Sequence, residues 1–239
     1  MPKFDLAQTQ ALARLFTIPR ETRGDAWRTE FYAAVVDASL VGFDPQVVWG
    51  PDGFPYFQLA LPPAGAFTPF CISHILDHVL DSGFGVAVFG NPERRGEPEW
   101  VFTYGDLLAL ALFARFDGDP AGRDALAART DGVWSEKIET GRKVAVGAPA
   151  ETYLPARARR VLGAFLRQAA GVPDPKIALV VDPALEPATN LAFDLGPADF
   201  GGDESRFAGV MQALTWFLPR THALLALPDL GAANFQSLP

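Results

Sequence analysis

Short apolar runs alternate with helical patterns in the second half of the chain, and this alternation constrains the fold more than any other feature. KVAVG, IALVVD, NLAFDL and HALLAL have the length of strands. Two amphipathic segments separate them, ESRFAGVMQALTWFL and ARARRVLGAFLRQAAG, and the latter places Val161, Leu162, Phe165, Leu166 and Ala169 on one face. The order is βαββαβ. It predicts a ferredoxin-like domain over residues 140–239, with an antiparallel sheet and both helices on one face.

The first half predicts a separate domain over residues 1–118. Asp5 is the expected cap of a first helix, and a second begins near Asp25. VVWGPDGFPYFQLAL has the pattern of two strands joined by a tight turn, and GVAVFG with PEWVFTY has that of a second hairpin. One helix between the hairpins and another after them complete an antiparallel ββαββα sheet. The stretch from Phe116 to Gly132 gathers Gly, Asp and Pro and loses strong periodicity, so residues 119–139 are the predicted connector. The chain is therefore expected to be an α+β protein of two domains.

The helix between the hairpins holds the most concentrated candidate chemistry. Its capping residues predict a helix over 69–82, with Thr68 as N-cap and Gly83 as a left-handed C-cap. His74 and His78 are four residues apart, so they share a face and suit a common metal ion. Cys71 is seven residues from His78, about 10.5 Å of helical rise. Since metal–ligand bonds measure only about 2.0 to 2.3 Å, one ion is not expected to bind all three side chains.

Two other interpretations of this helix need no metal. The favoured one buries a stripe of Ile72, Ile75, Leu76, Val79 and Leu80 and leaves the histidines on its flank. The other places Cys71 third in the helix, where the dipole lowers a thiol pKa and favours nucleophilic catalysis. Neither His74 nor His222 is expected to reach Cys71 as a general base, so a small buried cysteine is preferred.

Charged clusters elsewhere have structural explanations. Asp199, Asp203 and Glu204 lie between a strand and a helix and suit a cation, but an N-cap and the helix dipole account for the last two. Arg94 and Arg95 stand among glutamates, which indicates a solvated turn. A second basic group, Arg157, Arg159 and Arg160, is expected on the polar face of its helix.

Composition excludes several classes of partner. The chain has 20 Lys plus Arg against 28 Asp plus Glu, a formal charge of −8 and a pI near 4.9. Phosphate backbones and anionic membranes attract basic surfaces, so neither nucleic acid nor membrane is the expected partner. A single cysteine permits no intrachain disulfide, and the first residues lack a secretory pattern. The longest apolar run, Leu107–Ala114, is far shorter than the roughly 20 residues that cross a bilayer. We expect a cytoplasmic protein, and without dinucleotide, phosphate-loop or esterase motifs we expect no cofactor.

The second half resembles one known family. Gly147-Ala148-Pro149-Ala150 ends a strand before a helix, Val172 precedes the next strand, and Leu218-Pro219 precedes the last. These positions, spread over roughly Arg142 to Asp229, resemble the C-terminal domain of the SseB family, bacterial proteins linked to enhanced serine sensitivity. In the first half, FYAAVVDASL with a later Phe-Thr, at 67–68 or 102–103, is similar to that family's N-terminal domain. The resemblance implies a two-domain cytosolic protein without catalytic residues to transfer.

The expected function is protein interaction or regulation without catalysis. The expected contact surface is either the aromatic first hairpin, with Trp49, Phe54, Tyr56 and Phe57, or an exposed sheet face of the C-terminal domain. Sheet edges and faces also favour a homo-oligomer. One alternative is a metal-dependent enzyme or binder that uses Cys71, His74 and His78. Another is an amino-acid sensor, by analogy with ferredoxin-like domains.

Overall fold

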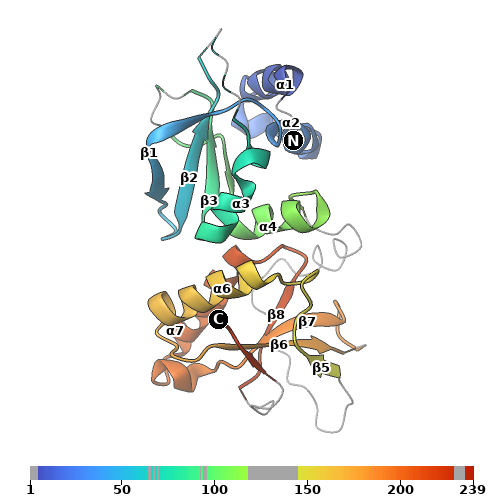
Figure 1. The fold of residues 1–239 in the computed structure, drawn as a ribbon, viewed down its shortest axis with the longest axis vertical. Helices are drawn as coiled ribbons and strands as arrows, with labels where there is room; N and C mark the ends of the chain where they lie inside the picture. Colours follow the sequence, from blue (N-terminus) through green and yellow to red (C-terminus); the bar gives the residue numbers. More distant parts are fainter. Residues whose placement is uncertain are drawn as a thin grey trace. The chain divides into compact units, whose positions relative to one another are not determined.

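The computed structural model describes residues 5–63, 66, 68, 70–91, 93, 96–117, 145–182, 184–228 and 235–239. The predicted connector at 119–139 lies outside these residues. The chain divides into two compact units, residues 1–107 and 108–239. Each contains its own sheet, so the protein is α+β with two sheets (Figure 1).

Unit 1 combines one four-stranded sheet with helices. Its elements are α1 (Leu6–Phe16), α2 (Asp25–Val35), β1 (Val41–Trp49), β2 (Pro55–Ala60), α3 (Ile72–Ser82), β3 (Gly85–Phe89), β4 (Trp100–Phe102) and α4 (Tyr104–Phe113), of which α4 continues into unit 2, and a short 3-10 turn, Arg20–Thr22, precedes α2. The strands lie in the order β1-β2-β3-β4. β1 with β2 and β3 with β4 are antiparallel hairpins, as the turn residues predict.

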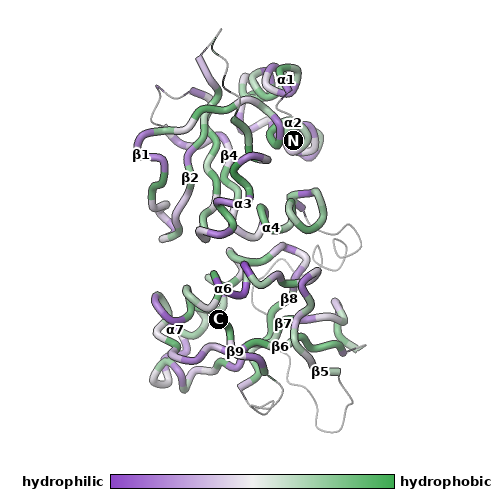
Figure 2. Tube along the Cα trace, viewed as in Figure 1, coloured by the Kyte–Doolittle hydropathy of each residue, from purple (hydrophilic) through white to green (hydrophobic). Residues whose placement is uncertain are grey.

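The sheet of unit 1 is mixed, which corrects the prediction of an antiparallel sheet. β2 and β3 pair in parallel, with Tyr56 opposite Gly85 and Ala60 opposite Phe89. The reason is α3: a helix between two neighbouring strands carries the chain back to the end of the sheet where it started, so the next strand runs the same way. The central strand β3, with the sequence GVAVF, is hydrophobic over most of its length (Figure 2).

The N-terminal helices pack through aromatic rings onto this sheet. The carboxylate of Asp5 accepts a hydrogen bond from the Ala7 N–H at 2.7 Å, so Asp5 caps α1 as predicted. On α2, the Phe31 ring stacks on Phe102 of β4 with centroids 5.8 Å apart, and Trp27 lies 5.7 Å from Trp100. This face of the sheet is therefore the core of unit 1.

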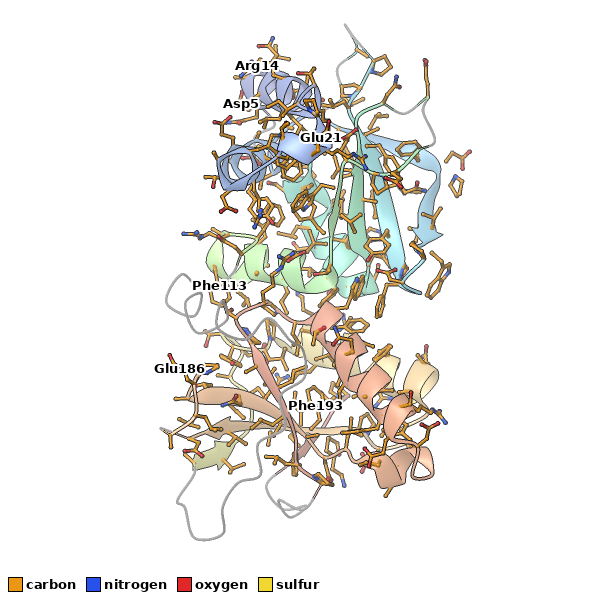
Figure 3. All side chains as sticks on the ribbon, turned by 180° about the vertical axis from the view of Figure 1, so that it is seen from behind. Asp5, Arg14, Glu21, Phe113, Glu186 and Phe193 are labelled. Carbon is orange, nitrogen blue, oxygen red and sulfur yellow. The ribbon has the colours of Figure 1, made fainter. Side chains whose placement is uncertain are left out.

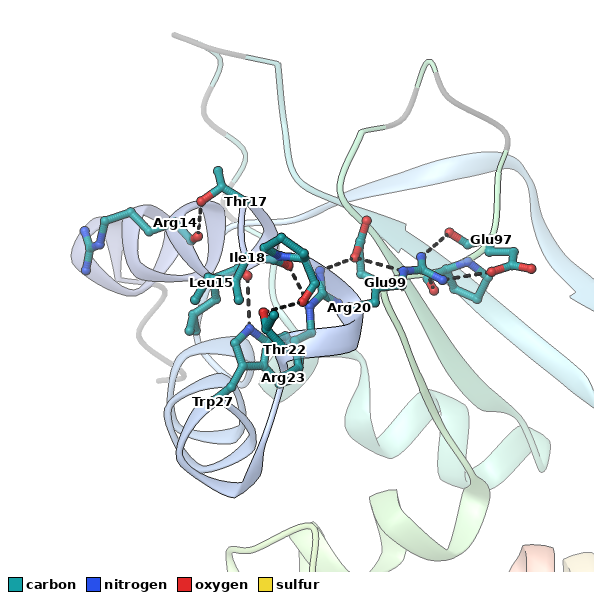
Figure 4. Close-up of polar contacts among 12 residues, drawn as sticks. Arg14, Leu15, Thr17, Ile18, Arg20, Thr22, Arg23, Trp27, Glu97 and Glu99 are labelled. Atoms are coloured by element: carbon teal, nitrogen blue, oxygen red, sulfur yellow. Dashed lines mark hydrogen bonds and ion pairs between the residues drawn. The ribbon is translucent and has the colours of Figure 1, made fainter.

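An ion-pair network fastens the chain between α1 and α2 to the residues before β4 (Figure 4). Arg23 lies 2.8 Å from a Glu99 carboxylate oxygen, donates to the Ile18 carbonyl at 3.0 Å and covers the Trp27 ring at 4.6 Å. Arg20 binds Glu97 at 2.9 Å. The Arg23 side chain is only 9% exposed, so the ion pair between Arg23 and Glu99 is shielded from solvent and has a structural role.

Unit 2 contains a second sheet. Its elements are β5 (Ala145–Gly147), α6 (Ala156–Phe165), β6 (Lys176–Val181), β7 (Thr189–Phe193), α7 (Glu204–Leu214), β8 (Ala223–Ala226) and β9 (Gln236–Ser237). The elements therefore follow the predicted βαββαβ order, and β9 is added at the end. The strands lie as β5-β6-β7-β8, and β9 pairs with β6.

The predicted ferredoxin-like topology is not confirmed. The strands lie side by side in chain order, and β7 pairs with β8 in parallel, whereas the prediction was an antiparallel sheet. α7 again connects two neighbouring strands as a crossover. Both units thus share the order helix, antiparallel hairpin, helix, parallel strand.

A π-helical turn changes the buried face of α6. Residues Leu166–Ala170 form π-helix rather than α-helix. Because a π turn contains one more residue than an α turn, the inward position moves one residue along the chain. Ala170 is buried and Ala169 is exposed, opposite to the prediction from an uninterrupted helical period.

Among the described residues of unit 2, the strands β6, β7 and β8 have buried residues on both faces of the sheet, whereas β5 and β9 are largely exposed. Leu191 and Phe193 are fully buried on one side of β7, and Figure 3 labels Phe193 on this strand. On the other side Ala178, Val180, Ala192 and Leu225 form a buried cluster with Leu185. The strands β6 to β8 therefore do not offer the exposed sheet face that was expected as a contact surface.

Among the described residues, no helix is both long and apolar enough to cross a membrane.

Candidate functional site

The start of α3 differs from the prediction and changes the setting of Cys71. The helix begins at Ile72, and Cys71 is its N-cap residue with extended backbone angles. Thr68 is not the cap, because its hydroxyl donates to the Leu40 carbonyl at 2.8 Å and so binds the segment before β1. Gly83 ends the helix in the left-handed region, φ 75°, as predicted.

His74 and His78 do not form a metal site with the residues that the structure describes. Both side chains are exposed on α3. Nδ1 of His74 lies 3.5 Å from the Cys71 sulfur, and the His78 ring contacts Phe57 at 6.0 Å. Within the described ranges, no three His, Cys, Asp or Glu side chains are grouped closely enough to hold a metal ion. A metal ion bound by His74 and His78 would therefore have no third ligand among the described residues.

Cys71 has the environment of a core residue. Its side chain has no solvent exposure, and burial raises the pKa of the thiol above its usual value. A nucleophilic cysteine needs the opposite shift, toward the thiolate. Of the predicted stripe, Ile72, Ile75, Val79 and Leu80 are buried and Leu76 is half-buried, which confirms the structural interpretation of α3.

The acidic loop before α7 also has a structural role. Asp203 accepts a hydrogen bond from the Arg206 N–H at 3.0 Å and is the N-cap of α7, as predicted. Asp199 accepts from the Gly196 N–H at 2.8 Å. Arg94 and Arg95 lie outside the described residues.

The aromatic first hairpin divides into buried and exposed members. Tyr56 is 6% and Phe57 2% exposed, and Phe54 is half-buried, so the expectation of four exposed aromatic side chains was wrong. Phe57 is covered by Phe70 and His78. Trp49 alone of the four remains open, with 74% of its surface exposed, the largest value among the large apolar side chains described.

The turn beside Trp49 holds the end of β1 in place. The Gly50 N–H donates to the Phe54 carbonyl at 2.8 Å, and Asp52 accepts from the Phe54 N–H at 3.2 Å and from the Tyr56 hydroxyl. Gly53 lies at φ 80°, a conformation that glycine adopts without strain. Trp49 is therefore presented from an ordered strand end, which lowers the entropy lost when a partner binds.

A buried histidine in unit 2 was missed from the sequence. His222 lies directly before β8, and its ring is 4.1 Å from that of Tyr153. Burial lowers the pKa of His222 and raises that of Tyr153 to about 12. A lone histidine before an apolar strand carries no pattern that distinguishes a buried ring from an exposed one, so only the fold reveals the contact.

The described residues of unit 1 line two hollows that could admit a small ligand. One of about 380 Å³ lies between α1 and α2 and includes Arg14, Ile18 and Glu30. The other, of about 310 Å³, lies against β1, beside Phe43 and Gln58. Neither hollow gathers the acid, base and nucleophile that a catalytic site requires.

Comparison with family models, curated proteins and solved structures finds no match for the chain. The resemblance to the SseB family therefore stays a prediction from the sequence.

Proposed function

We propose that the chain is a cytoplasmic, non-catalytic protein-interaction protein of SseB-like type, with Trp49 at the centre of its contact surface. The observation that carries the proposal is the 74% exposure of Trp49 on an ordered strand end. Burying a large apolar side chain gains about 1.5 to 3 kcal/mol, so a folded chain that leaves a tryptophan open forgoes that gain. Tryptophan is also among the residues most enriched at the centres of protein interfaces.

The other candidate activities receive less support from the described residues. Cys71 is buried with a raised thiol pKa, and His74 and His78 share no third ligand there. The SseB-like positions agree with the elements, because β5 ends at Gly147 and α6 follows at Ala156.

The test compares Trp49→Ala with a matched control, Leu6→Ala. Among the described residues, Leu6 is the most exposed large apolar side chain after Trp49, at 58%, and it lies on α1. Light scattering after size exclusion measures self-association, and quantitative capture from extracts of the source cells measures other partners. We expect Trp49→Ala to lose a contact that the wild-type chain and Leu6→Ala retain, with all three equally stable to heat. A monomeric wild-type chain without any retained protein, or equal behaviour of the two variants, would contradict the proposal.

A further inference from the structure

β1 lies at the edge of the sheet in unit 1. In the strand order β1-β2-β3-β4, it has a neighbouring strand on one side only, among the residues that the structure describes (Figure 1). It is also the longest strand described, with nine residues, whereas β4 at the opposite edge has three. Unpaired backbone groups on a sheet edge are a template for another strand. Of the two edges of this sheet, β1 therefore offers more backbone to a further strand.

The hairpin register shows which backbone groups of β1 point outward. The Gly50 N–H donates to the Phe54 carbonyl at 2.8 Å, so these two residues form a hydrogen-bonded pair. Bonded and non-bonded pairs alternate along an antiparallel hairpin, and the register continues without a break back to Val47. Trp49 and Val47 are therefore in non-bonded pairs, and their N–H and C=O groups point away from β2. Pro55 opposite Trp49 agrees with this, since proline has no N–H to donate.

These outward groups have no partner among the residues that the structure describes. Within that part of the chain, no hydrogen bond involves the N–H or C=O of Val47 or Trp49. Val47 is half-buried and Trp49 is exposed, and neither carries a charge that would repel a neighbouring strand. Pro45 and Pro51, which have no N–H, bound the open stretch on its two sides. We call Val47–Trp49, with its outward backbone groups, the β1 edge.

The side chains of the β1 edge favour one kind of neighbour. Val47 and Trp49 are two residues apart in the strand, so they face the same side of the sheet. A strand added along the edge would place alternate side chains of its own beside them. An aromatic ring and a β-branched side chain form a favourable cross-strand pair. A β-branched residue in the added strand would therefore cover the Trp49 ring, which is 74% exposed.

We propose that the β1 edge binds an extended segment of a partner protein, which adds to the sheet as a further strand and covers Trp49 with a β-branched side chain. This rests on the proposed function and adds the binding mode and the class of partner. The outward N–H and C=O groups of Val47 and Trp49 provide the hydrogen bonds that hold the segment. The Trp49 ring selects the side chain that lies beside it.

A second copy of the chain fits the β1 edge less well than a segment of another protein. In the antiparallel register that pairs Val47 with Trp49 of a second copy, Pro45 comes opposite Pro51, so pairing stops after these few residues. The second copy would also bring its own charge of −8 beside the first, and like charges repel. A segment of a different protein has neither disadvantage.

The test uses the full chain and two short synthetic peptides in which equal numbers of Val and Ser alternate. One peptide is N-methylated on every Ser, so the N–H groups of its Val residues stay free to pair. The other is N-methylated on every Val, so it can pair only with Ser beside Trp49. The two peptides match in composition and in methyl groups. The blocked edge of each also prevents the peptide from stacking into sheets.

NMR of the chain labelled with ¹⁵N-valine and ¹⁵N-tryptophan reports the amides of the β1 edge. Val47→Thr and Trp49→Phe assign the two signals by their loss. We expect the peptide with free Val N–H groups to move the Val47 and Trp49 signals downfield, because their N–H groups gain acceptors. The Trp27 signal, from α2, is expected to stay in place. The other peptide is expected to bind at least about tenfold more weakly.

Val47→Pro separates strand pairing from other kinds of contact. It removes the outward N–H and leaves the pairing with β2 intact, because that N–H is not bonded to β2. Val47→Thr is the matched control, since it keeps both the N–H and the branched side chain. We expect Val47→Pro and Trp49→Ala each to weaken peptide binding at least about tenfold by fluorescence anisotropy, and Val47→Thr less than about threefold. Thermal unfolding checks that the variants fold; if Val47→Pro does not, the two peptides and Trp49→Ala decide.

Three results would overturn the inference: equal binding of the two peptides, Val47 and Trp49 signals that do not move, or a folded Val47→Pro that binds as tightly as Val47→Thr. If Trp49→Ala still loses a cellular partner in any of these cases, the proposed function stands and only the binding mode is wrong. A wild-type dimer that Val47→Pro dissolves also overturns the inference, because the occupant is then a second copy. If Trp49→Ala loses nothing in any assay, both proposals fail.

Discussion

Nε2 of His222 lies 2.8 Å from the carbonyl oxygen of Tyr153, and the rings of the same two residues are 4.1 Å apart. A carbonyl oxygen only accepts, so Nε2 must donate and carry the proton of the neutral ring. Nδ1 is buried and has no hydrogen-bond partner among the residues that the structure describes. Unit 2 thus holds a neutral histidine that cannot accept a second proton without placing a charge in an apolar site.

Acid is therefore expected to destabilise unit 2 through His222. Burial, partly offset by the hydrogen bond to Tyr153, lowers the folded-state pKa below the unfolded value of 6.5. Because the unfolded chain takes up the proton first, the stabilisation is complete above pH 6.5 and is lost as the pH falls through the folded-state pKa. Thermal unfolding from pH 8 to 5 should show a falling midpoint for the wild-type chain and a flatter profile for His222→Gln. His78→Gln, at an exposed position, is the control and should follow the wild-type profile; if His222→Gln also follows it, the histidine is not the cause.

Cys71 is expected to resist thiol reagents in the native protein. The sulfur has no solvent exposure, and burial raises the thiol pKa, so little thiolate is present at neutral pH. Reaction with a disulfide reagent such as DTNB should be slow in buffer and fast after unfolding in guanidinium. One thiol per chain should react in the unfolded protein, since the chain has one cysteine. Rapid reaction without denaturant would show that the N-cap of α3 opens easily.

Local sequence patterns predicted the elements well and their pairing poorly. Helical periodicity located α2, and Trp27, Phe31, Ala34 and Val35 are buried as expected, because one helix face is set by residues close together in sequence. Whether β2 meets β3 in parallel depends on where α3 returns the chain, and strand alternation is the same in parallel and antiparallel pairs. The one-residue shift from Ala169 to Ala170 likewise depends on hydrogen bonds that composition does not encode.

The candidate site shows the same limit. An aromatic run near a turn identified Trp49 as a contact residue, but it could not distinguish Trp49 from Tyr56 and Phe57, which α3 and the neighbouring strands bury. Burial of those two residues is decided by tertiary packing, which a run of aromatic residues near a turn does not show.

Arg23 is expected to stabilise unit 1 in a way that lysine cannot replace. Its guanidinium reaches the Glu99 carboxylate and the Ile18 carbonyl at once, and covers the Trp27 ring. An ammonium group lacks that planar fork, so Arg23→Lys should lower the free energy of unfolding by about 1 to 3 kcal/mol. Arg28→Lys, in an exposed pair with Asp25, should change it by less than about 0.5 kcal/mol. Urea unfolding of both variants measures the difference, and similar values for the two would show that the network around Glu99 contributes little.

Gly85 and Gly209 are expected to respond in opposite directions to the same substitution. A Cβ atom at Gly85 would lie 2.6 Å from the Phe102 carbonyl oxygen and 2.6 Å from the Tyr56 ring, at the start of β3. Backbone and ring are both held in the sheet, so Gly85→Ala should destabilise unit 1 by about 1 to 3 kcal/mol. A Cβ at Gly209, inside α7, meets nothing within 4 Å. Gly209→Ala should therefore stabilise unit 2 by about 0.5 to 1 kcal/mol, because alanine loses less backbone entropy in a helix. Calorimetry of the two variants provides the comparison, and a neutral Gly85→Ala would mean that Tyr56 moves aside at little cost.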